Sequence, residues 1–182
     1  RIGSVNRSGA SALIGWIRET RPDDDLVLLA AGDLPLEVRL QRPDMVGIDR
    51  LLDAVAANHL RTRHRPAVVV DVGTAVTVDL ISADGAFLGG AILPGIQMSA
   101  RAMHEFTDLL PLIGMDALRS PPPALGTDTA EAMRSGLFWG AVGAVNELVG
   151  RLAEYAGAAP EVFLSGGAGP AVAELLGEQA QH

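Results

Sequence analysis

The chain has 182 residues, of which 48% are hydrophobic, and its mean hydropathy is +0.26, so it can bury a real core and is not a disordered protein. Its 22 acidic and 14 basic residues give a net charge of −8, which disfavours binding to nucleic acid or to an anionic membrane surface. The absence of cysteine excludes thiolate chemistry, and no run approaches the roughly 18 apolar residues of a membrane span, so we expect a soluble, cytoplasmic protein.

The first third of the sequence alternates short apolar runs with turn residues, which is an α/β pattern. Arg1 is followed by residues 2–5, which have the composition of a strand interior and not of a signal sequence, so we expect the chain to be truncated there. The other elements expected in this part are a helix over residues 8–20, apolar runs over 26–31 and 36–40, and a helix over 47–60.

A second unit begins at Pro66 and contains three β-rich runs separated by turn residues, which predicts three antiparallel strands. The segment 129–155 repeats apolar residues at steps of three and four, which indicates one long helix. The elements expected here are strands over 67–71, 76–82 and 87–92, helices over 98–110 and 129–155, a proline-rich loop over 120–126, a strand over 161–164, a glycine turn over 165–169, and a last helix from Pro170.

The most informative segment is residues 71–79, DVGTAVTVD, in which an apolar strand ends at a carboxylate and leads into a glycine turn with hydroxyl groups. Asp71 can hold a hydrated cation, and Thr74 can offer a hydroxyl and an N–H to a phosphate oxygen. Asp and Gly also form ordinary hairpin turns. Taken alone, the segment supports a nucleotide site and a plain turn about equally.

A second segment, Gly47-Ile48-Asp49-Arg50, lies at a predicted helix start. Asp49 can accept a proton from an alcohol, and Arg50 can pair with a carboxylate or a phosphate. A carboxylate in the first helical turn is also stabilised by the exposed N–H groups without any catalytic role. On its own, the segment favours this structural interpretation.

Three further segments have ordinary structural explanations when each is taken singly. Residues 89–95, GGAILPG, allow close packing or a ligand against the backbone. Thr127, Asp128 or Thr129 is expected to cap the long helix, with a substrate contact from Thr129 as the alternative. Residues 165–167, SGG, suit either a flat ligand such as adenine or a left-handed turn. The four histidines show no metal-ligand spacing: His59, His64, His104 and His182.

Taken together and in this order, the segments resemble the type III pantothenate kinases, a family of the acetate and sugar kinase, Hsp70 and actin superfamily. The resemblance extends over residues 4–167 and rests on residues 43–50, 71–79, 89–95 and 128–136. It implies an α/β fold of two actin-like (ribonuclease H-like) lobes, with mixed sheets flanked by helices and the active site between the lobes. The lobes would comprise residues 1–65, truncated at the start, and residues 66–182.

The resemblance also implies an activity, namely ATP-dependent phosphorylation of pantothenate to 4′-phosphopantothenate, the first step of coenzyme A biosynthesis. Such in-line transfer depends mainly on positioning and on cation screening. Mg²⁺ and a monovalent cation, K⁺ or NH₄⁺, are the implied cofactors, and a homodimer is the implied assembly. The implied roles are Asp49 as proton acceptor, Gly47, Ile48, Asp49, Arg50 and Thr129 as pantothenate contacts, Thr74 as an ATP contact and Asp71 as the ligand of the monovalent cation.

The sequence departs from the family in three places. Members begin with a strand that carries an Asp-x-Gly-Asn-Thr or Ser loop around the ATP phosphates, and nothing before Ser4 supplies it, so we expect this chain alone to bind ATP poorly. Members also continue beyond the last expected helix, and they usually have Asn where Asp128 stands. A non-catalytic regulator of the same fold is the main alternative, against which the Asp49-Arg50 pair argues. A sugar or acetate kinase of the wider superfamily is a third.

Overall fold

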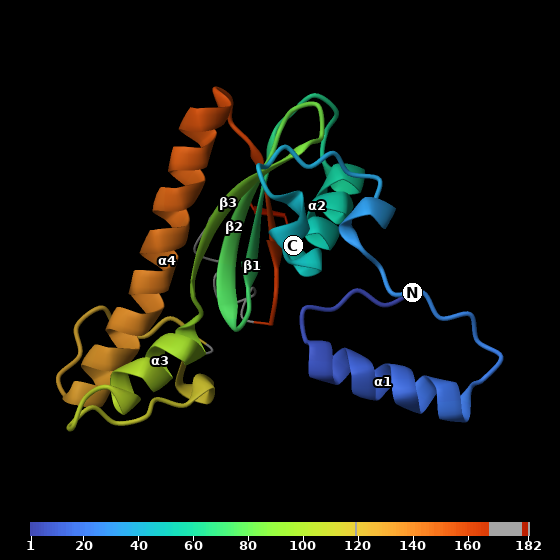
Figure 1. The fold of residues 1–182 in the computed structure, drawn as a ribbon. Helices are drawn as coiled ribbons and strands as arrows, with labels where there is room; N and C mark the ends of the chain where they lie inside the picture. Colours follow the sequence, from blue (N-terminus) through green and yellow to red (C-terminus); the bar gives the residue numbers. More distant parts are fainter. Residues whose placement is uncertain (119, 168–179, 182) are drawn as a thin grey trace.

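The structure, a computed structural model, describes residues 1–118, 120–167 and 180–181 (Figure 1). Its centre is one mixed β-sheet with the strand order β3-β2-β1-β4-β5. β1 pairs antiparallel with β2, and β2 antiparallel with β3, whereas β4 runs parallel to β1 and to β5. The α/β class and the three antiparallel strands are therefore confirmed. The strands are β1 (Ala67–Val72), β2 (Ala75–Ile81), β3 (Phe87–Pro94), β4 (Glu161–Ser165) and β5 (Ala180–Gln181).

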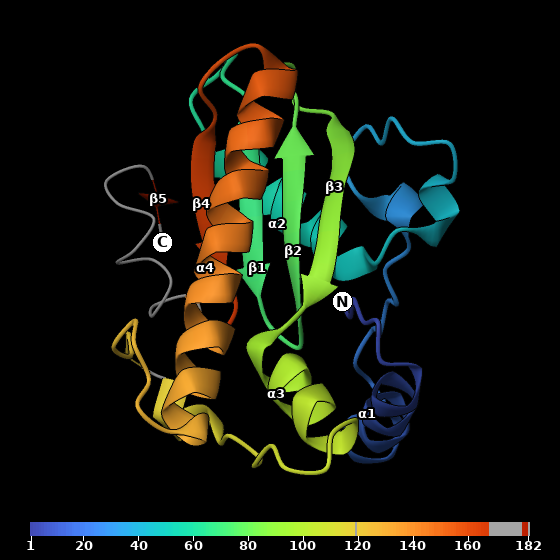
Figure 2. The same ribbon diagram turned by 90° about the vertical axis from the view of Figure 1, so that its left-hand side faces the viewer.

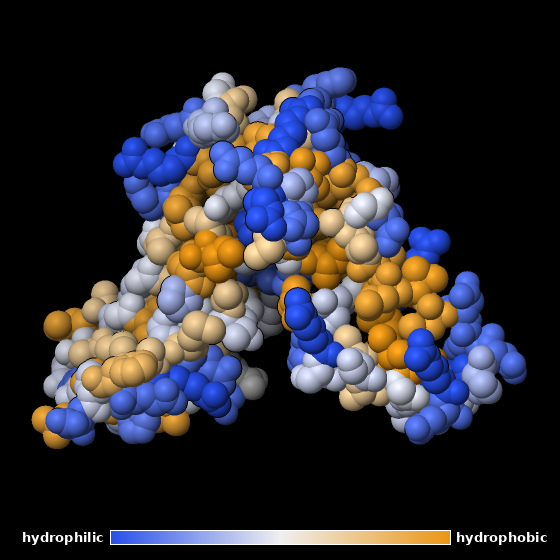
Figure 3. Space-filling view, in the orientation of Figure 1, coloured by the Kyte–Doolittle hydropathy of each residue, from blue (hydrophilic) through white to orange (hydrophobic). Residues whose placement is uncertain are grey.

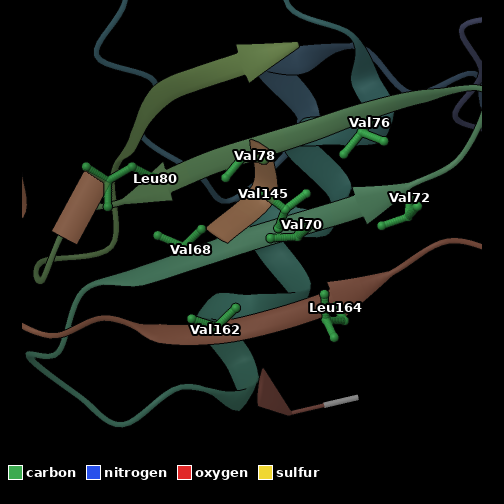
Figure 4. Packing of buried hydrophobic residues seen from close by; sticks show 9 residues of the cluster. All are labelled: Val68, Val70, Val72, Val76, Val78, Leu80, Val145, Val162 and Leu164. Atoms are coloured by element: carbon green, nitrogen blue, oxygen red, sulfur yellow. The ribbon is translucent and has the colours of Figure 1, made fainter. Parts of the chain in front are cut away.

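The long helix α4 (Thr129–Ala156) covers one face of the sheet (Figure 2). Successive residues of a strand point to opposite faces, so every second residue of β1, β2 and β4 points toward α4. These residues are almost all valine or leucine, and they enclose Val145 of the helix (Figure 4). The cluster consists of Val68, Val70, Val72, Val76, Val78, Leu80, Val145, Val162 and Leu164.

The other face of the sheet packs against α2 (Ile48–Leu60), which lies behind the sheet in Figure 2. Leu51, Ala54 and Ala57 recur at helical spacing on α2 and are buried. They pack against Ala67, Val69, Ile81, Phe87 and Phe163 of the strands. Since α2 begins one residue after Gly47, this packing holds the first turn of the helix against the sheet.

The sequence predicted a helix over residues 98–110, whereas the helix α3 spans Ile96–Glu105 and ends earlier. The apolar residues that extended the predicted pattern do not pack, since Phe106 is 84% exposed and Leu109 is 90% exposed. The Thr107 hydroxyl donates to the carbonyl of Met103 at 2.6 Å, and this hydrogen bond lies at the end of the helix. The predicted last helix from Pro170 lies outside the described residues.

The first 47 residues lie beside the sheet and contain α1 (Arg7–Thr20), in which no residue is buried. The strand-like character of residues 2–5 yields a single parallel bridge, in which the Ile2 N–H donates to Val27 and the Leu29 N–H donates to Ile2, both at 2.8 Å. The run 36–40 likewise forms one bridge, between Val38 and Phe87. Three short 3₁₀ helices complete the described elements: Ala31–Asp33, Pro43–Met45 and Met115–Leu118.

None of the helices in the described part of the chain has the length and apolarity that crossing a membrane requires.

Candidate functional site

Most of the predicted site residues lie near one end of the sheet, where β1 ends and α2 begins. On β1 and β2 the strand register pairs Asp71 with Thr77 and Val69 with Asp79. Asp71 and Asp79 therefore point to the face on which α2 lies, opposite to the valine cluster under α4. Two carboxylates of the nonapeptide thus meet the first turn of the helix.

Arg50 and Asp79 form a buried, bidentate ion pair between α2 and β2. Nε of Arg50 donates to one carboxylate oxygen of Asp79 at 2.9 Å, and Nη2 donates to the other. The side chains are 15% and 3% exposed, respectively. The guanidinium also lies over the Phe87 ring, 5.5 Å from its centroid. The hydrogen bonds that Arg50 donates to Asp79 raise the pKa of Arg50 above its ordinary value, so the guanidinium stays charged.

Gly90 makes room for this pair. A Cβ atom on Gly90 of β3 would lie 2.6 Å from a carboxylate oxygen of Asp79 and would collide with the carbonyl of Val78. A glycine in a strand often marks such a close approach. Gly90 is therefore required by the close approach of the β2 backbone and of the Asp79 carboxylate, whereas Gly89 has a φ of +95°.

Asp49 lies at the exposed beginning of α2, next to the anchored Arg50. Its Oδ1 accepts the backbone N–H of Arg50 at 2.9 Å, so the side chain folds back over the helix start. Gly47 is the N-cap, and a Cβ atom there would collide with the same Asp49 oxygen. The exposed carboxylate can accept a proton from a hydroxyl group placed at this helix end.

Asp53 and Asp71 extend the acidic character of this region. Burial first, and then the charges of Asp71, Asp49 and Asp79, raise the pKa of Asp53 from 3.8 to about 6. Burial, followed by the charges of Asp49 and Asp79, also raises the pKa of Asp71. Four carboxylates are thus within electrostatic reach of one another, with Arg50 as the partner of one, and a cation near Asp71 would relieve the repulsion. Asp53 was not among the residues predicted for the site, although its position one helical turn after Asp49 indicates that the two carboxylates share a face of α2.

Three of the predicted glycine segments meet at the turn between β1 and β2. The Gly95 N–H donates to the Thr74 carbonyl at 3.0 Å, and a Cβ on Gly95 would lie 2.8 Å from the Thr74 carbonyl carbon. Gly166 has φ +92°, and a Cβ there would lie 2.5 Å from the Val72 carbonyl oxygen and collide with a carboxylate oxygen of Asp71. The left-handed turn that the sequence allowed at 165–167 is therefore present, and it encloses Asp71.

Thr129 is the first residue of α4 and is exposed. The expected cap is Asp128, whose Oδ1 accepts the Glu131 N–H at 2.8 Å, while Oε2 of Glu131 accepts the N–H and the hydroxyl of Thr127 at 2.8 and 2.7 Å. Within the described residues, no hydrogen bond joins Thr129 to the 47–50 segment. The structure therefore brings together Gly47, Ile48, Asp49, Arg50 and Asp71, places Thr74 at the adjoining turn, and leaves Thr129 on a separate element.

The end of the sheet that carries the β1–β2 turn faces a hollow. Figure 3 shows the molecular surface hollowed between the side formed by α3 and the side formed by α1, in the orientation of Figure 1. Among residues 1–118 and 120–167, no three His, Cys, Asp or Glu side chains converge as a ready-made metal site.

The fold and the site together define an α/β protein with a carboxylate at a helix start, an anchored arginine beside it and a glycine-enclosed turn nearby. A family model described as type III pantothenate kinase matches residues 1–151. The chain therefore belongs to the type III pantothenate kinase family.

Curated members of the family support this assignment. The chain is 44% identical over 142 residues to the type III pantothenate kinase of Paramagnetospirillum magneticum, covering 78% of this chain and 53% of that protein. It is 38% identical over 173 residues to the Acidiphilium cryptum kinase (95% and 63% covered) and 41% identical over 181 residues to the Rhodopirellula baltica kinase (98% and 64% covered). The chain thus spans between about half and two thirds of the length of these relatives.

A solved structure shares the fold. A Campylobacter jejuni protein described as a conserved Baf family transcriptional activator superposes with a TM-score of 0.60 at 22% sequence identity, covering 97% of this chain and 71% of that chain. This likeness concerns the fold alone.

Proposed function

We propose that the protein containing this chain is a pantothenate kinase that transfers the γ-phosphoryl group of ATP to the primary hydroxyl of pantothenate, the first step of coenzyme A biosynthesis. The observation that carries the proposal is the Asp49-Arg50 pair in a chain of this family, with an exposed carboxylate beside an arginine fixed by Asp79. A base and an anion-binding group are thereby adjacent at one helix start.

In this proposal Asp49 accepts the proton of the pantothenate hydroxyl as the new P–O bond forms. Its exposure at the start of α2 leaves it accessible to a substrate, and Gly47 allows its side chain to lie across the helix start. Gly47, Ile48 and Arg50 would contact pantothenate along the same turn. Thr129 lies on a separate element, at the start of α4. In this proposal the bound pantothenate extends from the start of α2 to Thr129.

Thr74 is assigned to ATP and Asp71 to a monovalent cation, K⁺ or NH₄⁺. The cation fits the residues present, because burial and neighbouring carboxylates raise the pKa of Asp71 and so disfavour its charged form until a positive charge approaches. Mg²⁺ would accompany ATP, and the cations would screen phosphate charge near four carboxylates. Thr74 is exposed in the β1–β2 turn, where its hydroxyl can reach a phosphate oxygen.

The arrangement of the whole protein is also part of the proposal. We assign residues 1–65 to a first actin-like lobe and residues 66–182 to a second, with the hollow of Figure 3 as the side on which substrates bind. We also propose a homodimer, which the family resemblance implies, and a cytoplasmic location, with which the cysteine-free composition is consistent.

The test is phosphorylation of pantothenate by the complete gene product, with ATP, Mg²⁺ and K⁺, compared with an Asp49→Asn variant. Loss of a general base predicts a fall in kcat of about 10²- to 10⁴-fold. Asp84→Asn is the matched control, since Asp84 is an exposed carboxylate that pairs with Arg39 in the β2–β3 turn at the opposite end of the sheet. Asp84→Asn should keep the wild-type rate.

The second candidate is a non-catalytic regulator of the same fold, and the Campylobacter jejuni protein that shares this fold is described as a transcriptional activator. A non-catalytic regulator built on this fold would show no turnover in the same assay, although the complete protein is folded. That result, obtained with a folded wild-type protein, would replace the kinase proposal with the regulator.

A further inference from the structure

Arg50 is bound along one edge only. Its Nε and Nη2 donate to the two oxygens of Asp79, and no described hydrogen bond involves its Nη1. A guanidinium has five N–H donors in a rigid planar fork, so fixing one edge also fixes the direction of the other. The Nη1 edge of Arg50 is therefore oriented by a buried partner and not by a flexible side chain.

Asp79 cannot itself touch a substrate. It lies on β2 within the sheet and is 2% exposed, with Gly90 of β3 against its carboxylate. Asp79 therefore acts on a bound ligand without touching it, and its hydrogen bonds connect it through Arg50 to the first turn of α2.

The surrounding charges explain why such a fixed pair is needed. Asp49, Asp53 and Asp71 lie within electrostatic reach of this pair, and each would attract a mobile guanidinium. They would also repel an anionic substrate. A bidentate contact with Asp79, together with the Phe87 ring, fixes the guanidinium of Arg50 in one position despite these competing attractions.

We propose that Asp79 is a positioning residue that aims the Nη1 edge of Arg50 at the carboxylate of the acceptor substrate. The inference rests on the proposed function, because it requires an acceptor that carries both a hydroxyl for Asp49 and an anionic group for Arg50. A purely structural ion pair would instead affect all acceptors alike.

The experiment compares two acceptors in the complete protein: pantothenate, and the analogue in which a primary alcohol replaces the carboxylate. In the Asp79→Asn variant, KM for pantothenate should rise about tenfold or more, the size expected for a weakened charge-assisted hydrogen bond. KM for the neutral analogue and kcat for both acceptors should change less than about twofold, which lies well below that effect.

Two further variants serve as a control and as a substitute for Asp79→Asn. Glu161→Gln is the matched control, because Glu161 is a buried carboxylate at the far end of β4 that accepts the N–H and hydroxyl of Thr62, and it should leave both KM values unchanged. If Asp79→Asn does not fold, Arg50→Lys carries the test, since a lysine keeps the charge but cannot bind along two edges. It should lower the preference for pantothenate over the neutral analogue in the same way.

Equal increases in KM for the two acceptors, or an unchanged KM for pantothenate in a folded variant, would overturn the positioning role while leaving the kinase intact. A folded wild-type protein that neither phosphorylates nor binds pantothenate would instead remove the proposed function, and this inference with it. The wild-type measurement therefore separates the two failures.

Discussion

Replacing Asp53 by Asn should stabilise the protein, and the gain should depend on pH. Asp53 is half-buried on α2, and its pKa is raised from 3.8 to about 6 by burial and by Asp71, Asp49 and Asp79. The folded state therefore holds this proton more tightly than the unfolded state. Below pH 3.8 the carboxyl is protonated in both states and has no effect on stability. Stability falls as the pH rises from 3.8 to about 6, and the loss is complete above that range.

The expected gain in the free energy of unfolding can be worked out from the raised pKa of Asp53. A rise from 3.8 to about 6 is roughly 2 pH units, or about 3 kcal/mol at 1.36 kcal/mol per unit. Asp53 is only half-buried, so solvent screening reduces this to about 1 to 1.5 kcal/mol. Asp53→Asn should therefore raise the free energy of unfolding by about 1 kcal/mol at pH 8 and by little at pH 4.

The assay is urea unfolding of wild type and variant at several pH values between 4 and 8, in a buffer without K⁺ or NH₄⁺. Asp25→Asn serves as control, since Asp25 is exposed in the loop after α1. The reasoning is refuted if Asp53→Asn does not stabilise at pH 8, or if it stabilises as much at pH 4. Added K⁺ should reduce the difference at pH 8, because a cation near Asp71 lowers the electrostatic cost of the Asp53 charge.

Two other predictions concern the sheet. Val145→Ala should lower the free energy of unfolding by about 2 kcal/mol in urea titrations, because Val145 is 1% exposed within the valine cluster. A similar loss for Leu109→Ala, at a 90% exposed site, would contradict the burial argument. Gly166→Ala should weaken the K⁺ dependence of turnover and also destabilise the fold, since φ +92° strains a side chain and the new Cβ would collide with Asp71. An unchanged K⁺ titration in this variant would separate Gly166 from the proposed cation site.

Local patterns were sufficient to predict most of the regular structure. Valine-rich runs on either side of the Gly73-Thr74 turn predicted the β1–β2 hairpin, and the apolar spacing of 129–155 predicted α4 to within one residue. The end of α3 was predicted wrongly, because Phe106 and Leu109 continue the helical pattern but have nothing to pack against. Periodicity indicates which face would be buried, whereas burial itself depends on a neighbouring element.

The candidate site was less accessible to prediction for a related reason. Asp49 and Arg50 were recognisable from their position at a helix start, but the sequence assigned Arg50 to a ligand and did not reveal Asp79 as its partner. That contact joins residues 29 positions apart and depends on the register of β2 and on the packing of α2. The raised pKa of Asp53 depends on burial and on Asp71 and Asp79, which the sheet brings beside α2, as well as on Asp49 one helical turn away.

The alternation along β1 and β2 divides two tasks between the odd and even positions of the same strands. Even-numbered residues such as Val70 and Val78 fill the core under α4, while odd-numbered residues such as Asp71 and Asp79 face α2 and the polar site. Selection can therefore refine thermal stability and substrate preference along one strand with little interference between them. Positions under α4 can therefore be repacked with little effect on the polar site, whereas a variant with altered acceptor choice is to be sought one residue away, on the side of the sheet that faces α2.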